Sequence, residues 1–508
     1  MNKTSNSKIA FKNVSSNLLL QFVVIISGFI MPKLLISSFG SDTYGLVASI
    51  TQFLSLIMLL EAGIGPVIKA KLYKYIASDD KNKILQILKS ASKFFNAIGY
   101  IFIIYVAILC FVFPLINDEF EQSLTVTLIL IMAISTLFEY FFGIVYNLYL
   151  QADKKYYVVS YVQIFCYIFN ILLVVFLIYM GASIVVVKIA NTVAFIIKPI
   201  FQYYYVRKKL KIDYKKVTED YKIENKFDGL SQHVAYVINV NTNVLVLTAF
   251  TNLATVAVYS IYNLVTTAVD RVVGAFTNGM DSIFGDMFAR NERESLTKSF
   301  GMYEFVYYSV AMIVYLPTLI LIIPFVRIYT SGITDANYIQ PIFAILLVIF
   351  TLFSTTRYVY SSLIYSVGHF KQTNLIVWLE AIINVVLSVV LVYNLGLIGV
   401  AIGSLVAALF RLICFMHYSS KVILQRNFMK SFKWLFIVFF QLIVIILFMH
   451  FNIINYVPTD YLTWAFYALI VLILSTVFVI FVNVLCNFTL AKDVFQFIKG
   501  KLFKNKVH

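Results

Sequence analysis

Fourteen long apolar stretches fill most of this 508-residue chain, and each is about as long as a bilayer crossing. A helix needs roughly 20 mainly apolar residues to span a hydrocarbon core about 30 Å thick. Ten-residue blocks of alternating polarity, which are typical of membrane β-barrels, are absent from the sequence. The sequence therefore predicts an all-α, polytopic membrane helix bundle. We place its transmembrane helices at residues 14–38, 43–68, 94–116, 124–150, 156–180, 183–206, 227–251, 255–289, 300–326, 339–366, 372–395, 396–420, 433–453 and 460–488.

Composition and charge support this fold class and orient the chain. The chain is 61% hydrophobic and 13% charged, whereas a soluble domain is about half apolar and about a quarter charged. Nearly all Lys and Arg outside the spans lie in alternate connections and in the two tails, and the opposite loops contain only Arg327. Because cytoplasmic loops are the basic ones, we expect both termini in the cytoplasm. The net charge of +16 is then mainly an orientation signal, and nucleic acid is not an expected partner.

The chain contains an internal repeat. Residues 170–179 read NILLVVFLIY and residues 384–393 read NVVLSVVLVY, and a glycine, Gly181 or Gly396, follows each. Each stretch lies in the fifth span of its half. Because the two stretches are six spans apart, an even number, the two halves enter the membrane in the same direction, as in transporters whose halves rock about a central site. The strongly polar segment RKKLKIDYKKVTEDYKIENK separates the halves. We therefore expect two six-helix repeats plus a C-terminal helix pair, with an N-terminal half at 1–206, a cytoplasmic linker at 207–226, a C-terminal half at 227–420, and two extra helices with a cytoplasmic tail at 421–508.

Charged residues within the spans are the candidates for function. A charge at the centre of a spanning helix costs about 2.5–3.5 kcal/mol, so these side chains are expected to face a wet cavity or one another. A guanidinium binds phosphate oxygens bidentately and keeps its charge, so arginines along a path favour an anionic passenger. The candidates for an anion-binding cavity are Arg271, Arg357, Arg411, Lys198 and Lys33. The candidates for ion coupling, or only for pairing helices, are Asp270, Asp281, Glu61, Glu139 and Glu380.

Metal and cofactor sites are not predicted. The four cysteines lie within spans, and neither they nor the five scattered histidines show metal-ligand spacing. The sequence also contains no Walker A motif, so we do not expect the chain itself to hydrolyse ATP.

Two short segments resemble signatures of the polysaccharide flippases of the multidrug/oligosaccharidyl-lipid/polysaccharide (MOP) exporter superfamily. In residues 39–73 these are Gly40, the Tyr44-Gly45 pair and the Gly63-x-Gly65 turn, and in the second half the stretch is VAVYS at 256–260. The resemblance implies a transporter of the bacterial cytoplasmic membrane that turns an undecaprenyl-diphosphate-linked oligosaccharide from the inner to the outer leaflet. Capsule, O-antigen or another surface polysaccharide is then assembled outside.

The resemblance also implies roles and partners. The three arginines would hold the diphosphate, while membrane lipids surround the chain and polysaccharide polymerase machinery acts with it. Many relatives carry an acid in the seventh span, where this chain reads NVNTNVLVL at 239–247. This departure puts cation coupling through that span in doubt.

Two alternatives remain open. A cation-coupled multidrug exporter of the same fold would have a cavity dominated by acids and aromatic rings. A membrane glycan polymerase or transferase would normally place catalytic groups in a sizeable aqueous loop, but the outer loops here are short. We therefore do not expect an enzyme.

Overall fold

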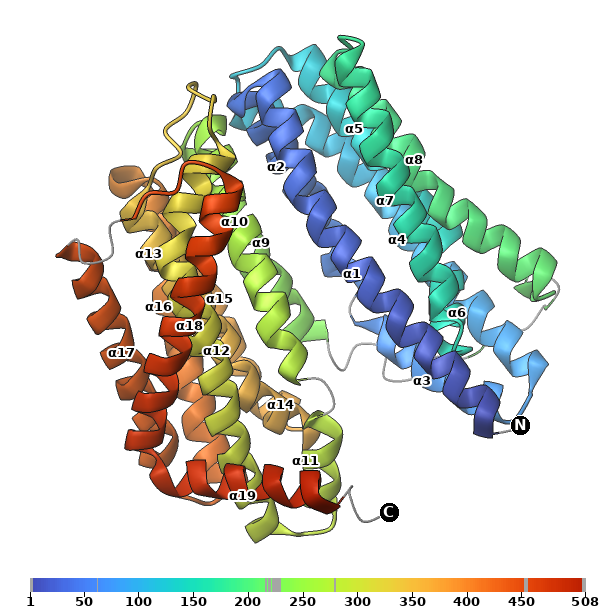
Figure 1. Ribbon diagram of the computed structural model, residues 1–508. Helices are drawn as coiled ribbons and strands as arrows, with labels where there is room; N and C mark the ends of the chain where they lie inside the picture. The colour runs from blue at the N-terminus through green and yellow to red at the C-terminus, as the bar shows by residue number, and fades with distance from the viewer. Residues whose placement is uncertain are drawn as a thin grey trace. The chain divides into compact units, whose positions relative to one another are not determined.

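The computed structural model describes residues 3–61, 63–214, 217, 221, 230–277, 280–451 and 456–504, so part of the predicted linker lies outside the described residues. Within them, fourteen helical segments are long and apolar enough to cross a membrane, and no strand occurs. The expected all-α polytopic bundle is confirmed (Figure 1). The elements are α1 (Lys3–Phe39), α2 (Ser41–Ser55), η1 (Leu56–Glu61), α3 (Ile64–Ala77), α4 (Lys81–Ile116), α5 (Gln122–Phe138), η2 (Glu139–Gly143), α6 (Ile144–Ala152), α7 (Tyr156–Tyr179), α8 (Ile184–Tyr204), η3 (Tyr205–Lys209), α9 (Leu230–Phe250), α10 (Leu253–Gly274), η5 (Ala275–Thr277), α11 (Met280–Ala289), α12 (Arg293–Tyr329), α13 (Pro341–Thr356), α14 (Tyr358–Ser366), α15 (Phe370–Leu395), α16 (Leu397–Tyr418), η6 (Ser419–Ile423), α17 (Met429–His450), α18 (Tyr461–Cys486) and α19 (Phe488–Lys504).

Two predicted spans are interrupted. The second span, expected at 43–68, ends at Glu61, and a separate helix, α3, begins at Ile64. Gly63 lies between them with φ of 67°, a left-handed conformation that glycine adopts without the steric cost other residues incur. The eighth span, expected at 255–289, is likewise divided into α10, the 3₁₀ turn η5 and α11. Both corrections concern backbone geometry, which a hydropathy profile does not predict.

The same irregularities recur in both halves and confirm the repeat. The second span consists of α2 and the 3₁₀ turn η1, with the separate helix α3 after it, and the eighth span consists of α10, the 3₁₀ turn η5 and the short helix α11. The fourth span is interrupted by the π-helical turn η2, and the tenth is interrupted at Arg357 between α13 and α14. The sixth and twelfth spans both end in a π-helical turn, η3 and η6.

The matched sequence stretches also adopt matching local structure. Asn191 on α8 donates to Asn170 Oδ1 on α7 at 3.1 Å, and Ser404 on α16 donates to Asn384 Oδ1 on α15 at 3.1 Å. The glycines that follow, Gly181 and Gly396, both have positive φ, at 73° and 52°. A buried asparagine therefore joins the fifth and sixth helices of each half in the same way.

The chain divides into two compact units, Met1–Ala257 and Val258–His508. The first contains α1 to α9 and the start of α10, and the second contains the rest of α10 and all later elements. The domain boundaries proposed from the sequence stay a prediction. Within the second unit, α15 and α16 pack closely through Gly399 and Gly403, which form a G-x-x-x-G pair on α16.

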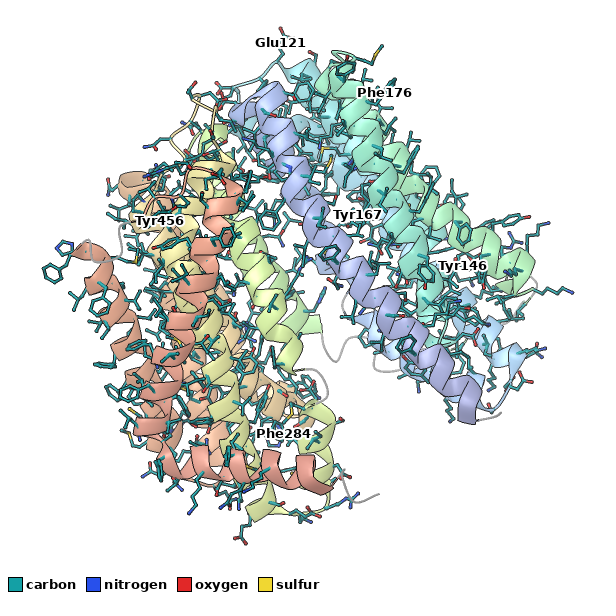
Figure 2. All side chains as sticks on the ribbon, viewed as in Figure 1. Glu121, Tyr146, Tyr167, Phe176, Phe284 and Tyr456 are labelled. Carbon is teal, nitrogen blue, oxygen red and sulfur yellow. The ribbon has the colours of Figure 1, made fainter. Side chains whose placement is uncertain are left out.

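Large apolar side chains cover the outside of the spans. On α7 these include Phe176, labelled in Figure 2, which is 58% exposed. Apolar side chains also remain exposed along α18, where Leu474, Val477 and Phe481 point away from the helix's buried face. An apolar exterior over helices of this length suits contact with lipid, and the chain is a multi-pass membrane protein.

Candidate functional site

Two of the candidate arginines share one buried carboxylate in the second unit. Arg357 Nη1 donates to Glu380 Oε1 at 2.8 Å, and Arg411 Nη1 donates to Glu380 Oε2 at 2.5 Å. Glu380 is 1% exposed, and both arginines are buried. We call Arg357, Glu380 and Arg411 the arginine cluster. Its members come from the α13–α14 junction, α15 and α16, so three spans must pack correctly to form it.

In the arginine cluster two guanidinium groups share the carboxylate of Glu380, and the carboxylate of Asp270 also interacts with the charge of Arg357. Arg411 Nη2 also donates to the hydroxyl of Tyr365 at 3.2 Å, and its guanidinium lies 4.8 Å from the ring centroid of Phe415. Arg357 Nε and Arg411 Nε are buried, and neither has a hydrogen-bond partner among the described residues. The shared carboxylate thus fixes both guanidinium groups and leaves two Nε–H donors without an acceptor among the described residues.

Asp270 and Asp281 both accept hydrogen bonds from the tenth span. Thr355 Oγ1 donates to Asp270 Oδ1 at 2.5 Å, and the Tyr358 hydroxyl donates to Asp270 Oδ2 at 3.3 Å. Ser362 donates to Asp281 Oδ1. These contacts attach α10 and α11 to α13 and α14 on both sides of the break at Arg357, so the acids hold spans together here.

The structure does not bring the third arginine into this group. Arg271 lies on α10 directly after Asp270, and its side chain is exposed. Its guanidinium is therefore open to solvent or ligand, unlike the buried guanidinium groups of the arginine cluster.

The first unit brings three other candidates together around a pocket of about 400 Å³. Lys198 Nζ lies 3.1 Å from Glu139 Oε1, and the hydroxyl of Tyr140 donates to Glu61 Oε1 at 2.7 Å. We call this site, with Glu61, Glu139 and Lys198 in its lining, the acidic pocket, because two carboxylates face one ammonium group. Tyr167 on α7, labelled in Figure 2, is also in the lining. Lys33 is partly exposed on α1 and is not in the lining.

The arginine cluster and the acidic pocket occupy corresponding places in the repeat. Lys198 follows Asn191 on α8 by the same interval at which Arg411 follows Ser404 on α16. The two intervals are two helical turns, so the side chains return to the same helix face. The fourth span contributes Glu139 at its π turn, and the tenth contributes Arg357 at its break.

The fifth spans complete this correspondence. Glu380 stands one turn before Asn384, and Cys166 stands one turn before Asn170. Glu380 of the second half therefore corresponds to Cys166 of the first half. Arg357 lies near the position that corresponds to Glu139. Sequence reasoning missed this relation, although the two asparagine-anchored stretches contain the signal.

Asn241 of the seventh span packs α9 against α2 in the first unit. Gln52 and Ser55 of α2 both donate to Asn241 Oδ1, the second at 2.6 Å. Two turns further along α9, Thr248 forms a buried hydrogen bond with Ser49 at 2.7 Å. The polar residues of α9 thus bind it to α2.

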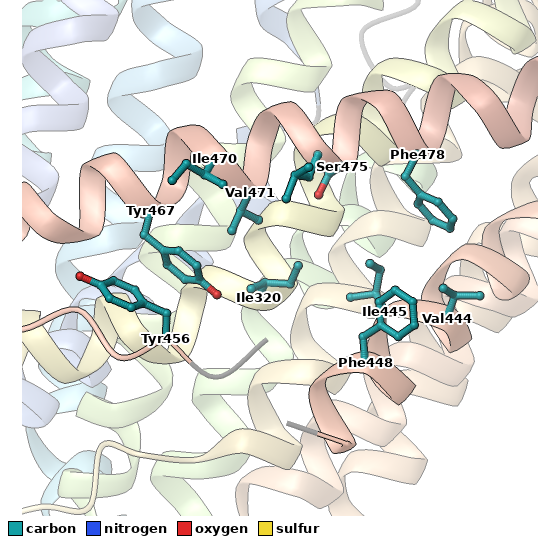
Figure 3. A pocket seen from close by; sticks show the side chains of 11 residues that line it. Ile320, Val444, Ile445, Phe448, Tyr456, Tyr467, Ile470, Val471, Ser475 and Phe478 are labelled. Atoms are coloured by element: carbon teal, nitrogen blue, oxygen red, sulfur yellow. The ribbon is translucent and has the colours of Figure 1, made fainter. Parts of the chain in front are cut away.

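Besides the arginine cluster, the second unit contains an apolar pocket. A pocket of about 520 Å³ lies between α12, α17 and α18, and Figure 3 shows the aliphatic and aromatic side chains that line it. The rings of Tyr456 and Tyr467 lie 5.1 Å apart at one end, and Phe448 and Phe478 lie toward the other. Such a lining suits a hydrocarbon chain.

Comparison with known proteins assigns the chain to a family. The family described as polysaccharide biosynthesis protein matches residues 10–279, which is more than half of the chain. The chain belongs to this family. The recognition based on the Gly40 to Gly65 motifs and the 256–260 stretch is thereby confirmed. No curated protein sequence matches this family member.

Solved structures show that this family member has the fold of MOP-superfamily transporters. An inward-facing MATE-family multidrug resistance transporter matches with a TM-score of 0.65 at 16% identity, over 78% of this chain and 97% of that chain. The lipid II flippase MurJ, in an inward closed conformation, matches with a TM-score of 0.67 at 15% identity, over 94% of this chain and 99% of that chain. A MOP-superfamily transporter from Pyrococcus furiosus matches with a TM-score of 0.53 at 14% identity, over 83% and 95%. At these identities the likeness establishes the fold.

Proposed function

We propose that the protein is a flippase that moves an undecaprenyl-diphosphate-linked oligosaccharide from the inner to the outer leaflet by alternating access between its helical halves. The arginine cluster is the observation that carries this proposal, because its two guanidinium groups keep Nε–H donors without an acceptor, and such donors suit a diphosphate. Family membership supports a role in polysaccharide biosynthesis. The proposal includes the bacterial cytoplasmic membrane, cytoplasmic termini and a product for surface polysaccharide assembly.

The structure also offers an apolar surface that suits the lipid part of such a substrate. The apolar pocket between α12, α17 and α18 offers a surface for part of an isoprenoid chain. The solved relative MurJ is described as a flippase of lipid II, which is a lipid cargo. Polymerase machinery would act after the sugar unit reaches the outer leaflet.

Removing one arginine of the cluster is expected to reduce flipping at least tenfold and to leave membrane insertion intact. In Arg357→Gln or Arg411→Gln the remaining guanidinium and Glu380 form a neutral pair, so the attraction for the diphosphate is lost while the carboxylate stays paired. The measurement is flipping of a fluorescently labelled undecaprenyl-diphosphate oligosaccharide in proteoliposomes. Arg271→Gln tests the exposed third arginine in the same assay.

Arg290→Gln is the matched control for these variants. Arg290 follows the last residue of α11 and forms an exposed pair with Asp286, four residues earlier, so its removal changes the net charge equally without touching the cluster. Wild-type flipping by all three test variants would refute the anion-site proposal.

A cation-coupled multidrug exporter is the second candidate, and the acidic pocket favours it. Under this alternative, an imposed Na⁺ or H⁺ gradient would drive export of a cationic dye, and Glu61→Gln with Glu139→Gln would abolish it. Under the flippase proposal we expect no dye export from proteoliposomes with either gradient. The control is the labelled lipid assay on the same vesicles, which shows that the reconstituted protein is active.

A further inference from the structure

The second unit contains another pocket, of about 730 Å³, at the end of α12 where Arg293 lies. Its wall is formed by α12, the segment after η6, the start of α17, and α19, which packs across α12 and α18 (Figure 1). Five basic and two acidic residues line it, so the pocket carries a net positive charge. We call it the basic pocket.

Arg426 is a buried residue in the wall of the basic pocket. Its Nη2 donates to Glu304 Oε2 at 2.5 Å, and Ser431 donates to Glu304 Oε1 at 2.6 Å. The Arg426 side chain is 7% exposed, and its guanidinium lies 5.1 Å from the ring centroid of Phe300. A buried ion pair thus fixes this arginine in the wall.

Two buried donors at the basic pocket have no partner. Arg426 Nε and Asn487 Nδ2 are both buried, and neither has a hydrogen-bond acceptor among the described residues. A buried donor without an acceptor is costly, so this wall is suited to a ligand that brings acceptor oxygens. Lys298 and Lys430, also in the lining, are exposed and have no ion pair in the described part of the chain.

The position of α19 indicates where such a ligand would come from. This helix begins two residues after the last residue of α18, and Phe488 and Phe495 are each 67% exposed. An amphipathic helix with exposed aromatic side chains lies in the membrane interface, at the depth of the lipid headgroups. Basic pockets between spanning helices at this depth bind anionic headgroups.

We propose that the basic pocket binds the phosphodiester headgroup of an anionic membrane lipid. The phosphate oxygens accept from Arg426 Nε and Asn487 Nδ2, and Lys298 and Lys430 neutralise the charge at the rim. The bound lipid holds α19 against α12 and α18. The site is separate from the arginine cluster and does not depend on the proposed transport activity.

The test uses the full chain, purified in detergent, with phosphatidylglycerol added in increasing amounts. Binding is followed by the rise in unfolding temperature and by native mass spectrometry. The test variant is Lys298→Gln with Lys430→Gln, which leaves the buried Arg426–Glu304 pair in place. Lys371→Gln with Lys421→Gln is the matched control, since it removes two exposed lysines of the same unit outside the pocket.

We expect the test variant to bind phosphatidylglycerol at least tenfold more weakly than the wild type, because two positive charges that attract the anionic headgroup are removed. The control variant is expected to bind as the wild type does. Equal weakening in both variants would overturn the site and leave only non-specific charge attraction.

Inorganic pyrophosphate and phosphatidylcholine distinguish the source of the phosphate. We expect neither to stabilise the wild type as phosphatidylglycerol does, because one lacks the acyl chains and the other has no net charge. Equal stabilisation by pyrophosphate, lost in the test variant, would overturn the lipid assignment in favour of a soluble phosphate compound.

Discussion

Replacing Glu380 with Ala is expected to destabilise the protein by about 3–5 kcal/mol, because removal of one partner leaves a buried charge uncompensated. Glu380 is the carboxylate for both Arg357 and Arg411, so two guanidinium groups lose their counter-charge at once. Both arginines are buried in the described structure, and solvent cannot replace the lost interaction without a local rearrangement. The measurement is the free energy of unfolding in detergent micelles, from denaturant titration.

Asp286→Ala is the control for this stability measurement. Asp286 also pairs with an arginine, Arg290, at 3.0 Å, but both side chains are more than half exposed. Exposed pairs of this kind contribute about 0.3–0.5 kcal/mol, so the variant is expected to unfold almost as the wild type does. Equal stability of Glu380→Ala and Asp286→Ala would contradict the buried cluster.

A triple variant separates stability from transport. Arg357→Met, Glu380→Leu and Arg411→Met together replace the cluster with apolar side chains of similar size, and such exchanges are often neutral or stabilising. We expect the triple variant to recover the stability lost in Glu380→Ala and to remain inactive in flipping. Restored flipping in this variant would show that the cluster only holds helices together.

The sequence predicts which charges lie within spans but not which of them are buried or which of them pair. Hydropathy places Arg357, Glu380 and Arg411 within spans, and the cost of burial requires a partner or a wet cavity. The choice of partner depends on how each helix is rotated, and a sequence that is apolar on nearly every face does not indicate rotation. The repeat puts the two halves in register at Asn170 and Asn384, and this register shows which positions of the two halves correspond.

A hydropathy profile does not predict the breaks within spans, for a different reason. Residues 56–68 are as apolar as the rest of the second span, so the predicted helix continues through them. The positive φ of Gly63 ends it instead, and nothing in a hydropathy profile reports φ. The Gly63-x-Gly65 motif was noticed as part of a family signature, and its structural role is this turn between η1 and α3.

Replacing Gly403 with Ala is expected to destabilise the protein by about 1–3 kcal/mol, the usual cost of overfilling a packed interface. A Cβ at Gly403 would lie 2.7 Å from the backbone nitrogen of Ser388, and one at Gly399 would lie 2.4 Å from Leu391 O. Backbone atoms cannot rotate away as side chains can, so α15 and α16 must separate. The double variant Gly399→Ala, Gly403→Ala is expected to lose more stability than either alone.

This separation is also expected to reduce flipping, because α16 carries both Gly403 and Arg411, and α15 carries Glu380. Moving the helices apart lengthens the 2.5 Å contact between Arg411 and Glu380 and loosens the donors meant for the diphosphate. Gly274→Ala is the control, since a Cβ there meets its nearest atom, in the Tyr358 ring, at an ordinary 3.7 Å. Flipping is measured at a temperature where the variant is fully folded, so that a loss of rate reports the displaced arginine. A variant that is destabilised yet flips at the wild-type rate would show that transport does not need Arg411 held in this position.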